Sequence, residues 1–541
     1  MTSGWLALIL FALLTFLPAL STLPVVDRDE ARFVQASRQM VESGDYVDIR
    51  FQDEPRHKKP VGIYWLQSAA VLVWGEGPDA PLWVYRLPSI LGAVLSVLLL
   101  AVVGTPLFGR QVALLGAAVF AAGLVIGGEA RIAKTDAALL ATILVAQAVL
   151  ARLYLQRTGG PQIGGRAAAY AFWLAIGAGT LIKGPIGPMV PALTILALIA
   201  VDRKADWLRP LWSPWPIIVA LVLVLPWFVA ITFRSNGAFW LGSVGADLLP
   251  KIASGQEGKG APPGSYLVLM WLTFWPATPL LLLSLQSIWR ARTDPATRFC
   301  LAWAIPVWLV YEAVPTKLIH YALPVYPALA LLAVAHLPAG LAAHSRLLRG
   351  LAALAILPGL ALGVAVAAFA LQQDALPAAG LAGAGLAGAL VTTGFAVRSA
   401  LGSSPWTLAA RAALAGAILH AGLISAAARI PALWPTDSAV SVAQEIAAAQ
   451  GCDHPIVSGW GYGEPSLVWH GGRDTDLFPA SASASEVVHL GACQVVVHAR
   501  ESATAPIPLI RGCRPARTIT GLVIGAGHWV TLDVLDCQGE P

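Results

Sequence analysis

Residues 84–104 read VYRLPSILGAVLSVLLLAVVG, a nearly unbroken apolar stretch. In a helix, about twenty such residues cross the roughly 30 Å hydrocarbon layer of a bilayer. The whole chain suits these surroundings, because 57% of its 541 residues are hydrophobic and 12% are charged. That leaves too little polar surface to cover a water-soluble globule of this size. The sequence therefore predicts a mostly α-helical, polytopic membrane protein, and the small net charge of +5 gives nucleic-acid binding little support.

Similar stretches along the chain bring the expected number of transmembrane helices to about 13. They lie at 4–23, 111–128, 136–155, 168–182, 186–201, 214–233, 265–286, 298–314, 319–337, 349–371, 378–397 and 408–427. The stretch 4–23 is short enough for a cleaved signal peptide, and Ala19-Leu20-Ser21 would suit a cleavage site. Its start, however, carries no basic side chain, as a signal peptide would. We therefore treat it as a span.

Arginine and lysine positions test the orientation independently, since short cytoplasmic connections hold an excess of these residues. With a cytoplasmic N-terminus, the even-numbered connections should be basic, and they are. They contain Arg110, Arg152, Arg157, Arg166, Arg203, Lys204, Arg209, Arg290, Arg292, Arg298, Arg346, Arg349, Arg398 and Arg411. An odd number of crossings then places the tail outside, so we expect a multi-pass protein of a bacterial inner membrane with a periplasmic C-terminal domain.

Two long loops, 24–83 and 234–264, are expected on the same outer side. In the first, apolar residues recur at helical spacing from Ala31 to Val41, and Ser43-Gly44-Asp45 ends the pattern. This predicts a helix on the membrane surface, in a loop that covers a site at the boundary of lipid and water. We divide the chain into a membrane domain, 1–435, and a periplasmic domain, 436–541.

The tail alternates β-type runs with a helical stretch, which predicts a small α/β domain. The runs are 455–458, 494–498, 518–524 and 529–534, and the helix is 440–449. Four of the five cysteines lie here, as expected in an oxidising compartment. Cys513 and Cys537 flank a hairpin turn at 525–527, so we prefer their pairing, which leaves Cys452 with Cys493. Four cysteines allow three pairings, and the sequence does not decide between them.

Ionisable residues at the outer ends of the spans are few, and at membrane depth each costs roughly 2.5 to 3.5 kcal/mol, so each needs a partner or a purpose.

Four stretches, in order along the chain, resemble motifs of the lipid-linked-sugar glycosyltransferases. This family includes bacterial aminoarabinose transferases acting on lipid A and, more remotely, protein O-mannosyltransferases. The stretches are Asp29–Phe33, Lys58–Pro60, Lys183–Pro185 and Thr316–Pro327. The resemblance implies a C-type glycosyltransferase architecture among membrane lipids. It also implies transfer, with inversion, of a sugar from a polyprenyl (undecaprenyl) phosphate to lipid A, another glycan or lipid, or a protein.

In such a transfer the sugar leaves an anionic carrier phosphate through an oxocarbenium-like transition state, so the leaving group needs cations more than a proton donor. One carboxylate opposite the leaving group is then enough to take the proton of an attacking hydroxyl. Together with this chemistry, the resemblance suggests a role for each candidate residue. Asp29 is the expected base, with Glu30 beside it. The carrier phosphate is expected to meet Lys59, Lys183, Arg131, Lys317 and Tyr321, and the substrate pocket to include Arg32, Lys58, Tyr64, Trp65 and Asp136.

Three positions depart from the family pattern: Lys58 replaces a Glu, Phe33 a Tyr, and Ala246-Asp247 a Glu-His pair. In the aminoarabinose transferases, the first and last of these positions help to hold a metal. No cofactor is therefore expected with certainty. A divalent metal stays open, with Asp247 as a weak ligand, and the acceptor is free to differ from that of the aminoarabinose transferases.

Structural interpretations stay open beside these roles. Asp29 suits a helix cap, Lys59 a side chain that snorkels to headgroups, Arg131 an ion pair with Asp136, Lys183 a plain turn, and Tyr321 an interfacial aromatic belt. The tail suits a scaffold or acceptor recognition. A transporter or flippase of a lipid-linked sugar is the alternative function, although internal repeats are not evident, and a non-catalytic envelope scaffold is a second.

Overall fold

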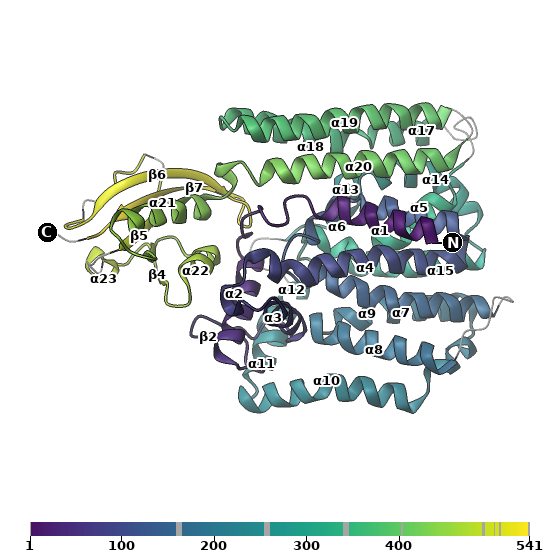
Figure 1. Cartoon of the computed structure of the whole chain (residues 1–541). Helices are drawn as coiled ribbons and strands as arrows, with labels where there is room; N and C mark the ends of the chain where they lie inside the picture. Colours follow the sequence, from purple (N-terminus) through teal and green to yellow (C-terminus); the bar gives the residue numbers. More distant parts are fainter. Residues whose placement is uncertain are drawn as a thin grey trace.

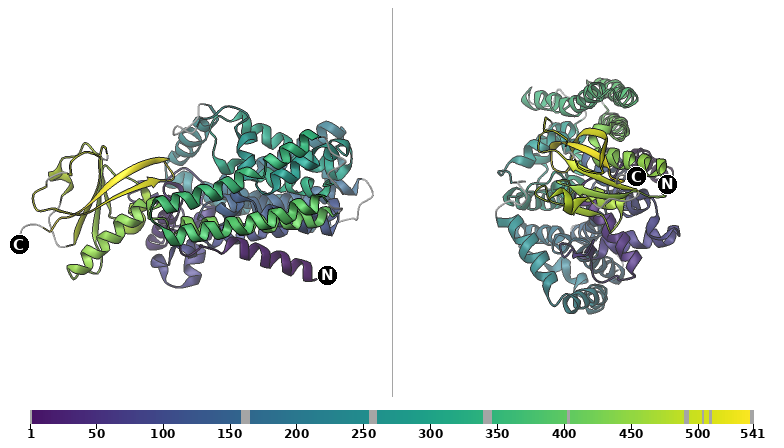
Figure 2. Two further views of the ribbon diagram at one scale, coloured as in Figure 1. Left: turned by 90° about the horizontal axis from the view of Figure 1, so that it is seen from above. Right: turned by 90° about the vertical axis from the view of Figure 1, so that its left-hand side faces the viewer.

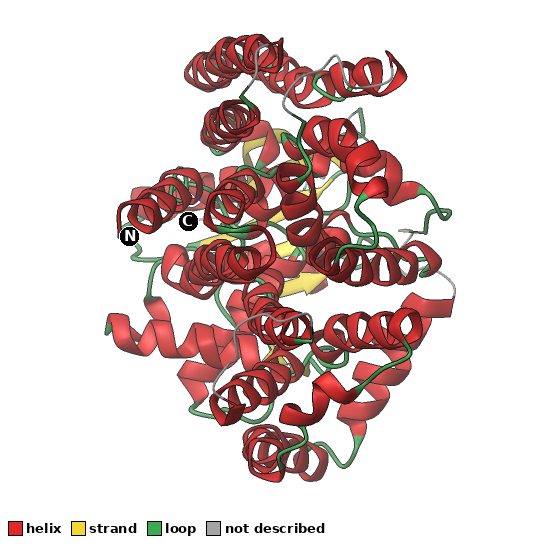
Figure 3. Ribbon diagram, turned by 90° about the vertical axis from the view of Figure 1, so that its right-hand side faces the viewer, coloured by secondary structure: helices red, strands yellow, loops and turns green. Residues whose placement is uncertain are grey.

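The computed structural model describes residues 2–157, 165–253, 260–338, 346–401, 404–488, 493–502, 504–507 and 510–538. Helices run side by side in a bundle, and a small domain with a sheet lies at one end of it (Figure 1). Viewed along the bundle, the helices are seen nearly end-on with the strands behind them (Figure 3). The predicted fold class, a helical membrane protein with a small C-terminal α/β domain, is confirmed.

Each predicted span has a helical counterpart. The helices are α1 (Thr2–Phe16), α4 (Leu82–Phe108), α5 (Arg110–Ala121), α6 (Leu124–Glu129), α7 (Asp136–Gln156), α8 (Gly165–Lys183), α9 (Ile186–Asp202), α10 (Pro214–Arg234), α13 (Ser265–Thr273), α14 (Ala277–Arg290), α15 (Pro295–Ala313), α16 (Tyr326–Ala335), α17 (Arg346–Leu354), α18 (Leu357–Gln372), α19 (Leu376–Leu401) and α20 (Pro405–Ala427). Within the described residues, seven helical segments are long and apolar enough to cross a membrane, or eight if the bent pair α13 and α14 forms one span.

The expected number of about 13 spans is therefore not confirmed. Several apolar stretches fold as shorter or interrupted helices. The stretch 111–128 divides into α5 and α6, and 319–337 begins with the 3₁₀ helix η4 (Ile319–Val325) before α16. Hydropathy measures how apolar a segment is but does not place the breaks within it.

The first long loop folds at the end of the bundle that faces the C-terminal domain (Figure 1). The predicted loop helix is α2 (Asp29–Ser43), and it ends at Gly44, whose φ of +69° is the left-handed conformation that glycine adopts freely. A second helix, α3 (Gly62–Trp74), packs so tightly on α8 that a Cβ at Gly62 would lie 2.7 Å from the backbone of Leu181. Most of α2 is buried, packed against α3 and α22, rather than resting on lipid alone.

The other elements outside the bundle are short. The first loop contains the hairpin β1 (Arg50–Phe51) and β2 (Glu54–Pro55) and the 3₁₀ helix η1 (Gly77–Asp79). The second contains α11 (Ala238–Trp240), the π-helix η3 (Leu241–Leu248) and α12 (Leu249–Ala253). Part of the second predicted loop, 254–259, lies outside the described residues.

The C-terminal domain contains a five-stranded sheet in the order β4-β3-β5-β7-β6. Its elements are α21 (Pro435–Ala449), β3 (Ile456–Trp460), α22 (Pro465–Gly471), β4 (Asp476–Phe478), α23 (Ala484–Val487), β5 (Gln494–Ala499), β6 (Arg514–Val523) and β7 (His528–Asp536). Strand β3 pairs in parallel with β4 and β5, and β6 with β7 forms the predicted antiparallel hairpin. The sequence did not predict the short strand β4.

Alternation along the strands builds the core of this domain, because every second side chain faces the same side of a sheet. Val495 and Val497 of β5 and Val534 of β7 are fully buried against α21. Disulfides join Cys452 to Cys493 and Cys513 to Cys537, the pairing preferred from the sequence. The hairpin of β6 and β7 reaches back to the bundle (Figure 2). The boundary at 435/436 stays a prediction.

Candidate active site

Two cavities meet at the end of the bundle nearest the C-terminal domain. The apolar cavity, of about 750 Å³, has walls from α10, α15 and the segment 239–252. The polar cavity, of about 420 Å³, has walls from the first long loop, the connection between α6 and α7, and the turn between β6 and β7. The residues that line both, here called the junction, are Lys58, Lys59, Asp136, Lys183, Asp247, Lys251, His320 and Tyr321. An ionic cluster therefore separates an apolar chamber from a polar one.

Asp29 is the first residue of α2 and lines the polar cavity. In the described structure, no side chain caps the start of α2, so the capping interpretation of Asp29 gains no support. Burial alone would raise the pKa of Asp29, but nearby positive charge, chiefly that of Lys134, outweighs it and holds the pKa below its usual value. Asp29 is therefore ionised at neutral pH and suited to accept a proton.

Glu30, in contrast, is fully buried and committed to Arg86 of α4. The Arg86 Nε and Nη2 atoms lie 2.8 and 3.0 Å from the two Glu30 carboxylate oxygens. Glu30 also accepts the N–H groups of Val26 (2.8 Å) and Ala133 (2.7 Å). This bonding argues against the catalytic role predicted for Glu30, because its oxygens are already occupied. Its carboxylate instead ties the start of α2 to the segment before α7.

Lys59 and Lys251 share one carboxylate at the junction. The Lys59 Nζ lies 2.6 Å from Asp247 Oδ2, and the Lys251 Nζ lies 2.6 Å from Asp247 Oδ1. Asp247 belongs to the π-helix η3, a rare helix type that is frequent at functional sites. Burial lowers the pKa of Lys59 to about 8, although the charge of Asp247 opposes the shift. Two cations around one anion leave a net positive charge here.

A second ion pair stands on the facing helices. The Lys183 Nζ, at the end of α8, lies 2.6 Å from Asp136 Oδ1, at the start of α7. The same ammonium lies 5.6 Å from the centre of the Tyr321 ring, within cation–π range. His320 Nε2 lies 3.8 Å from the same oxygen of Asp136. The predicted residues Lys183, Asp136 and Tyr321 thus come together, and Lys183 is more than a plain turn.

Arg131 was predicted to bind the carrier phosphate but is not among the described residues that line either cavity. Its fully buried guanidinium donates to the main-chain carbonyls of Thr15, Pro18 (2.7 Å) and Gly127 (2.6 Å). One of its nitrogens also lies 3.2 Å from His420 Nε2. Arg131 therefore joins α1, α6 and α20, and neither the phosphate role nor the ion pair with Asp136 describes it.

Lys317 lines the polar cavity, but its ammonium is already used. It donates to the carbonyls of Tyr311 (3.0 Å), Glu312 (2.9 Å) and Val314, at the end of α15. An ammonium has three protons, and cations stabilise the C-terminal end of a helix. Lys317 therefore caps α15, and the phosphate role predicted for it stays a prediction.

The predicted substrate-pocket residues divide into two groups. Arg32 and Lys58 line the polar cavity. Tyr64 is fully buried with its ring 5.4 Å from that of Phe33, and the Trp65 indole N–H donates to a loop carbonyl at 2.8 Å. Contrary to the prediction, Tyr64 and Trp65 therefore belong to the interior of the loop and not to the described cavity walls.

The sequence predictions gave no role to four residues of the site. Lys134 Nζ lies 3.1 Å from Glu129 Oε1, and His320 lies 3.6 Å from the same oxygen. Lys251 follows Asp247 by one helical turn, a spacing that the sequence displays. Arg56, two residues before Lys58, lines the polar cavity.

The residues present do not fit a divalent metal at the position that the resemblance suggested. Both oxygens of Asp247 bind lysines, and Lys58 adds a further cation close by. Across the described ranges, no group of three or more histidine, cysteine or acidic residues is arranged to hold a metal ion. No step below depends on a metal.

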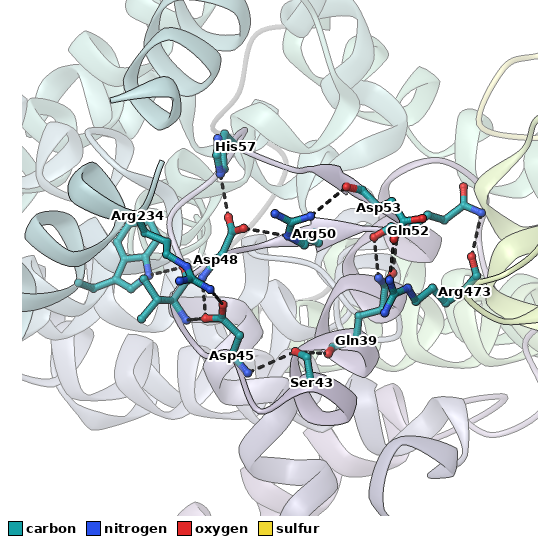
Figure 4. A network of polar contacts seen from close by, with 12 residues as sticks. Gln39, Ser43, Asp45, Asp48, Arg50, Gln52, Asp53, His57, Arg234 and Arg473 are labelled. Carbon is teal, nitrogen blue, oxygen red and sulfur yellow. Dashed lines mark hydrogen bonds and ion pairs between the residues drawn. The ribbon is translucent and has the colours of Figure 1, made fainter. Parts of the chain in front are cut away.

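The loop before Lys58 is held by a polar network (Figure 4). Asp48 lies 3.0 Å from the His57 Nε2, and Asp45 lies 3.2 Å from Arg234 at the end of α10. The same loop forms a 2.6 Å ion pair with Arg473 of the C-terminal domain. The loop is thus fixed to the bundle on one side and to the C-terminal domain on the other.

The C-terminal domain covers the polar cavity. Ile524 and Gly525, at the turn between β6 and β7, are part of its wall. A Cβ at Gly525 would lie 3.1 Å from the carbonyl oxygen of Asp27, so the turn touches the start of the loop. The Asp27 carboxylate accepts the N–H of Ser466 at 3.1 Å, and burial raises the pKa of Asp27 to about 6.

Comparisons with known proteins agree with this architecture. Residues 58–230 match the family described as dolichyl-phosphate-mannose-protein mannosyltransferase. The undecaprenyl phosphate-alpha-4-amino-4-deoxy-L-arabinose arabinosyl transferase of Pectobacterium carotovorum is 30% identical over 376 residues, 67% of this chain and 64% of that protein. Its counterpart in Aeromonas salmonicida is 30% identical over 61% of this chain and 59% of that protein. The matched region spans less than two thirds of each relative.

Two solved structures resemble the fold. ArnT from Cupriavidus metallidurans bound to undecaprenyl phosphate superposes with a TM-score of 0.75 over 100% of both chains, at 19% identity. The Archaeoglobus fulgidus oligosaccharyltransferase in the apo form gives a TM-score of 0.51, with 89% of this chain and 65% of that chain covered, at 12% identity. The resemblance seen in the sequence motifs is confirmed: over about two thirds of its length the chain is similar to undecaprenyl phosphate-aminoarabinose transferases, and it has the fold of ArnT.

Proposed function

We propose that the protein is a glycosyltransferase that moves a sugar from a polyprenyl phosphate, such as undecaprenyl phosphate, to an acceptor of the bacterial envelope. The junction carries this proposal, because it places lysines where an apolar and a polar cavity meet. The apolar cavity suits a prenyl chain, the lysines suit its phosphate, and the polar cavity suits a sugar and an acceptor. The similarity to an ArnT structure that contains undecaprenyl phosphate supports the same assignment.

The carrier phosphate would bind between Lys59, Lys183 and Lys251. As the glycosidic bond breaks, negative charge develops on this phosphate, and cations fixed in advance stabilise that charge without rearranging. Asp247 and Asp136 keep the three ammonium groups in place before the donor arrives. The leaving group then needs no proton donor.

Asp29 would remove the proton of the attacking hydroxyl. It lines the polar cavity but is not among the residues described around the apolar one, so it stands on the sugar side of the junction. A base on that side and a phosphate at the junction favour attack opposite to the leaving group, which inverts the anomeric centre. Glu30 and Arg86 act as positioning residues, because their buried pair fixes the start of α2.

For the orientation, we propose a cytoplasmic N-terminus and a periplasmic C-terminal domain in the inner membrane. The N-terminus and the C-terminal domain lie at opposite ends of the bundle (Figure 1). Basic residues of the predicted cytoplasmic connections gather at the N-terminal end. Arg157 and Arg298 each lie 2.6 Å from an oxygen of Asp202, and Arg110 is close to Gly4. Their position at this end of the bundle agrees with the distribution of basic residues from which the orientation was predicted.

The direct test is to incubate the purified protein with labelled undecaprenyl-phosphate sugars and with envelope acceptors. We expect transfer by the wild type and a loss of about 100-fold or more in kcat for Asp29→Asn, with donor binding unchanged. Asp53→Asn is the matched control, because Asp53 is an exposed acid of the same loop. Wild-type turnover by Asp29→Asn would remove Asp29 as the base, and no consumption of any lipid-linked sugar would end the proposal.

The alternative functions gain no specific support. The relatives and structures named above are transferases rather than transporters. The C-terminal domain contributes to the wall of the polar cavity, which fits acceptor recognition better than a separate scaffold. Labelling engineered cysteines from both faces of the membrane distinguishes a transporter, because alternating access changes which face is labelled.

A further inference from the structure

The polar cavity holds more positive charge than the carrier phosphate requires. Nine basic and five acidic side chains line it. Carboxylates lie beside Arg28, Arg32, Lys59, Lys134, Lys183 and Lys251, and carbonyls bind Lys317. For the two remaining cations, Arg56 and Lys58, the described residues provide no carboxylate within ion-pair distance. Their charges are available to a ligand.

Arg56 is the more informative of the two, because its side chain is 8% exposed. Its guanidinium lies beside the hydroxyl of the buried Tyr64, and in the described structure its Nε has no hydrogen-bond partner. A buried guanidinium normally has all its donors paired, so an unpaired one indicates a missing acceptor. Its planar fork of N–H groups matches a carboxylate or a phosphate in two-point geometry.

The surrounding structure holds Arg56 in place before any ligand binds. Its backbone N–H donates to the Ile49 carbonyl at 2.7 Å, and its own carbonyl accepts the Lys58 N–H at 2.9 Å. Its guanidinium carbon lies 5.2 Å from the centre of the Phe33 ring. A residue whose backbone is hydrogen-bonded and whose guanidinium packs on an aromatic ring loses less entropy on binding, which favours affinity.

The position of Arg56 separates it from the carrier phosphate. Arg56 lines the polar cavity, whereas the described wall of the apolar cavity does not include it. Its charge is among those that lower the pKa of Asp29, so it stands near the proposed base. A group bound by Arg56 is therefore on the sugar or on the acceptor.

We propose that Arg56, assisted by Lys58, forms an anion subsite in the polar cavity that recognises a second negatively charged group besides the carrier phosphate. That group is a carboxylate of the transferred sugar or a phosphate of the acceptor, since both present the same geometry to a guanidinium. This inference rests on the proposed function and deepens it, because it states the charge of the substrate. A positively charged amino sugar placed against Arg56 would be repelled.

The test compares substrates that differ in one charge. The donors are an undecaprenyl-phosphate hexose and the matching undecaprenyl-phosphate uronic acid, and the acceptors are lipid A and its dephosphorylated form. Arg56→Gln is measured beside Arg56→Lys, which keeps the charge. The control is Arg50→Gln, since Arg50 belongs to the same hairpin, pairs with Asp48 at 2.9 Å and is not among the described cavity residues.

We expect Arg56→Gln to lower kcat/KM about 10- to 100-fold for the charged substrate and less than about threefold for its neutral partner. Arg56→Lys should recover part of the loss, and Arg50→Gln should resemble the wild type. Selective loss with the uronic acid assigns the subsite to the sugar, and selective loss with phosphorylated lipid A assigns it to the acceptor. Equal loss on charged and neutral substrates, or no loss on either, overturns the proposal.

Binding measurements separate this inference from the proposed function. The dissociation constant of each donor is measured by quenching of tryptophan fluorescence, with the four substrate pairs assayed in parallel. Turnover by the wild type without charge selectivity at Arg56 overturns the anion subsite and leaves the transferase in place. Absence of turnover in every pair overturns the transferase, and the donor dissociation constants then decide whether Arg56 still selects the charged sugar.

Discussion

The Nε and Nη2 atoms of Arg86 lie 2.8 and 3.0 Å from the two carboxylate oxygens of Glu30, and neither side chain is accessible to solvent. Glu30 also accepts the N–H of Ala133. Asp29 and Lys134 are the immediate chain neighbours of Glu30 and Ala133. A buried ion pair at the wall of the polar cavity therefore sets the position of the proposed base relative to the lysine that keeps it ionised.

Breaking this pair should cost stability. We expect Glu30→Gln to lower the free energy of unfolding by roughly 3 to 5 kcal/mol, because it leaves Arg86 buried without a counter-charge. Thermal unfolding in detergent, followed by tryptophan fluorescence, measures the shift. Asp206→Asn, which breaks an exposed pair with Arg209, should change the stability by less than about 1 kcal/mol. Equal shifts in the two variants would contradict the assignment.

The carrier phosphate should bind less well at alkaline pH. Burial lowers the pKa of Lys59 to about 8, so Lys59 is a cation below that pH and becomes neutral as the pH rises through it. We expect kcat/KM for the donor to fall above about pH 8, because this parameter follows the ionisation of the free enzyme. Lys59→Arg should move the fall to higher pH, since a guanidinium stays charged. The same alkaline limb in both proteins would exclude Lys59 as its origin.

Two lysines of the polar cavity should respond differently to removal. Lys251→Ala removes an ammonium from the junction, so we expect kcat/KM for the donor to fall about 10- to 100-fold with little change in thermal stability. Lys317→Ala removes the cap of α15, so its main effect should be a lower unfolding temperature. Steady-state kinetics and thermal unfolding of both variants decide the matter. The reverse pattern would support the phosphate role predicted for Lys317.

Docking of the C-terminal domain should depend on Asp27 and on pH. Its folded pKa of about 6 lies above the ordinary value of 3.8, chiefly through burial, so the fold is favoured while Asp27 is protonated. This contribution is present below about pH 4 and is lost as the pH rises through 6. We expect Asp27→Asn to raise the unfolding temperature at pH 7.5 and to change it much less at pH 4, since an amide oxygen still accepts the Ser466 N–H. The same shift at both pH values would contradict this origin.

Most elements of the fold followed from the sequence, because hydropathy and spacing act over a few neighbouring residues. The predicted stretches near 84–104 and 136–155 became α4 and α7, and Gly44 ended α2 as expected. The number of full spans did not follow. A break such as the one between α5 and α6 depends on neighbouring helices and not on the local apolar content.

The same distinction between local pattern and distant contact applies to the residues of the candidate site. The motifs identified Asp29, Lys59 and Lys183, because chemistry at a membrane boundary restricts which charges are tolerated there. The sequence did not reveal that Arg131 binds carbonyls in the bundle, that Lys317 caps α15, or that Glu30 is sealed against Arg86. Arg86 lies 56 residues from Glu30 along the chain, and Pro18 lies 113 residues from Arg131, so neither contact is visible in a local pattern. The role of Lys317 depends on the exact residue at which α15 ends.

The sequence by itself therefore determined the membrane class, the order of the helices and the types of charge at the ends of the spans. Insertion into the membrane depends on how apolar each segment is and on the basic residues beside it. Both can therefore be recognised in the sequence without a structure. The tertiary structure alone decided which charges face a cavity, which are neutralised by a neighbour and which are left for a ligand. These are properties of distance and burial, and the energy between two charges depends on both.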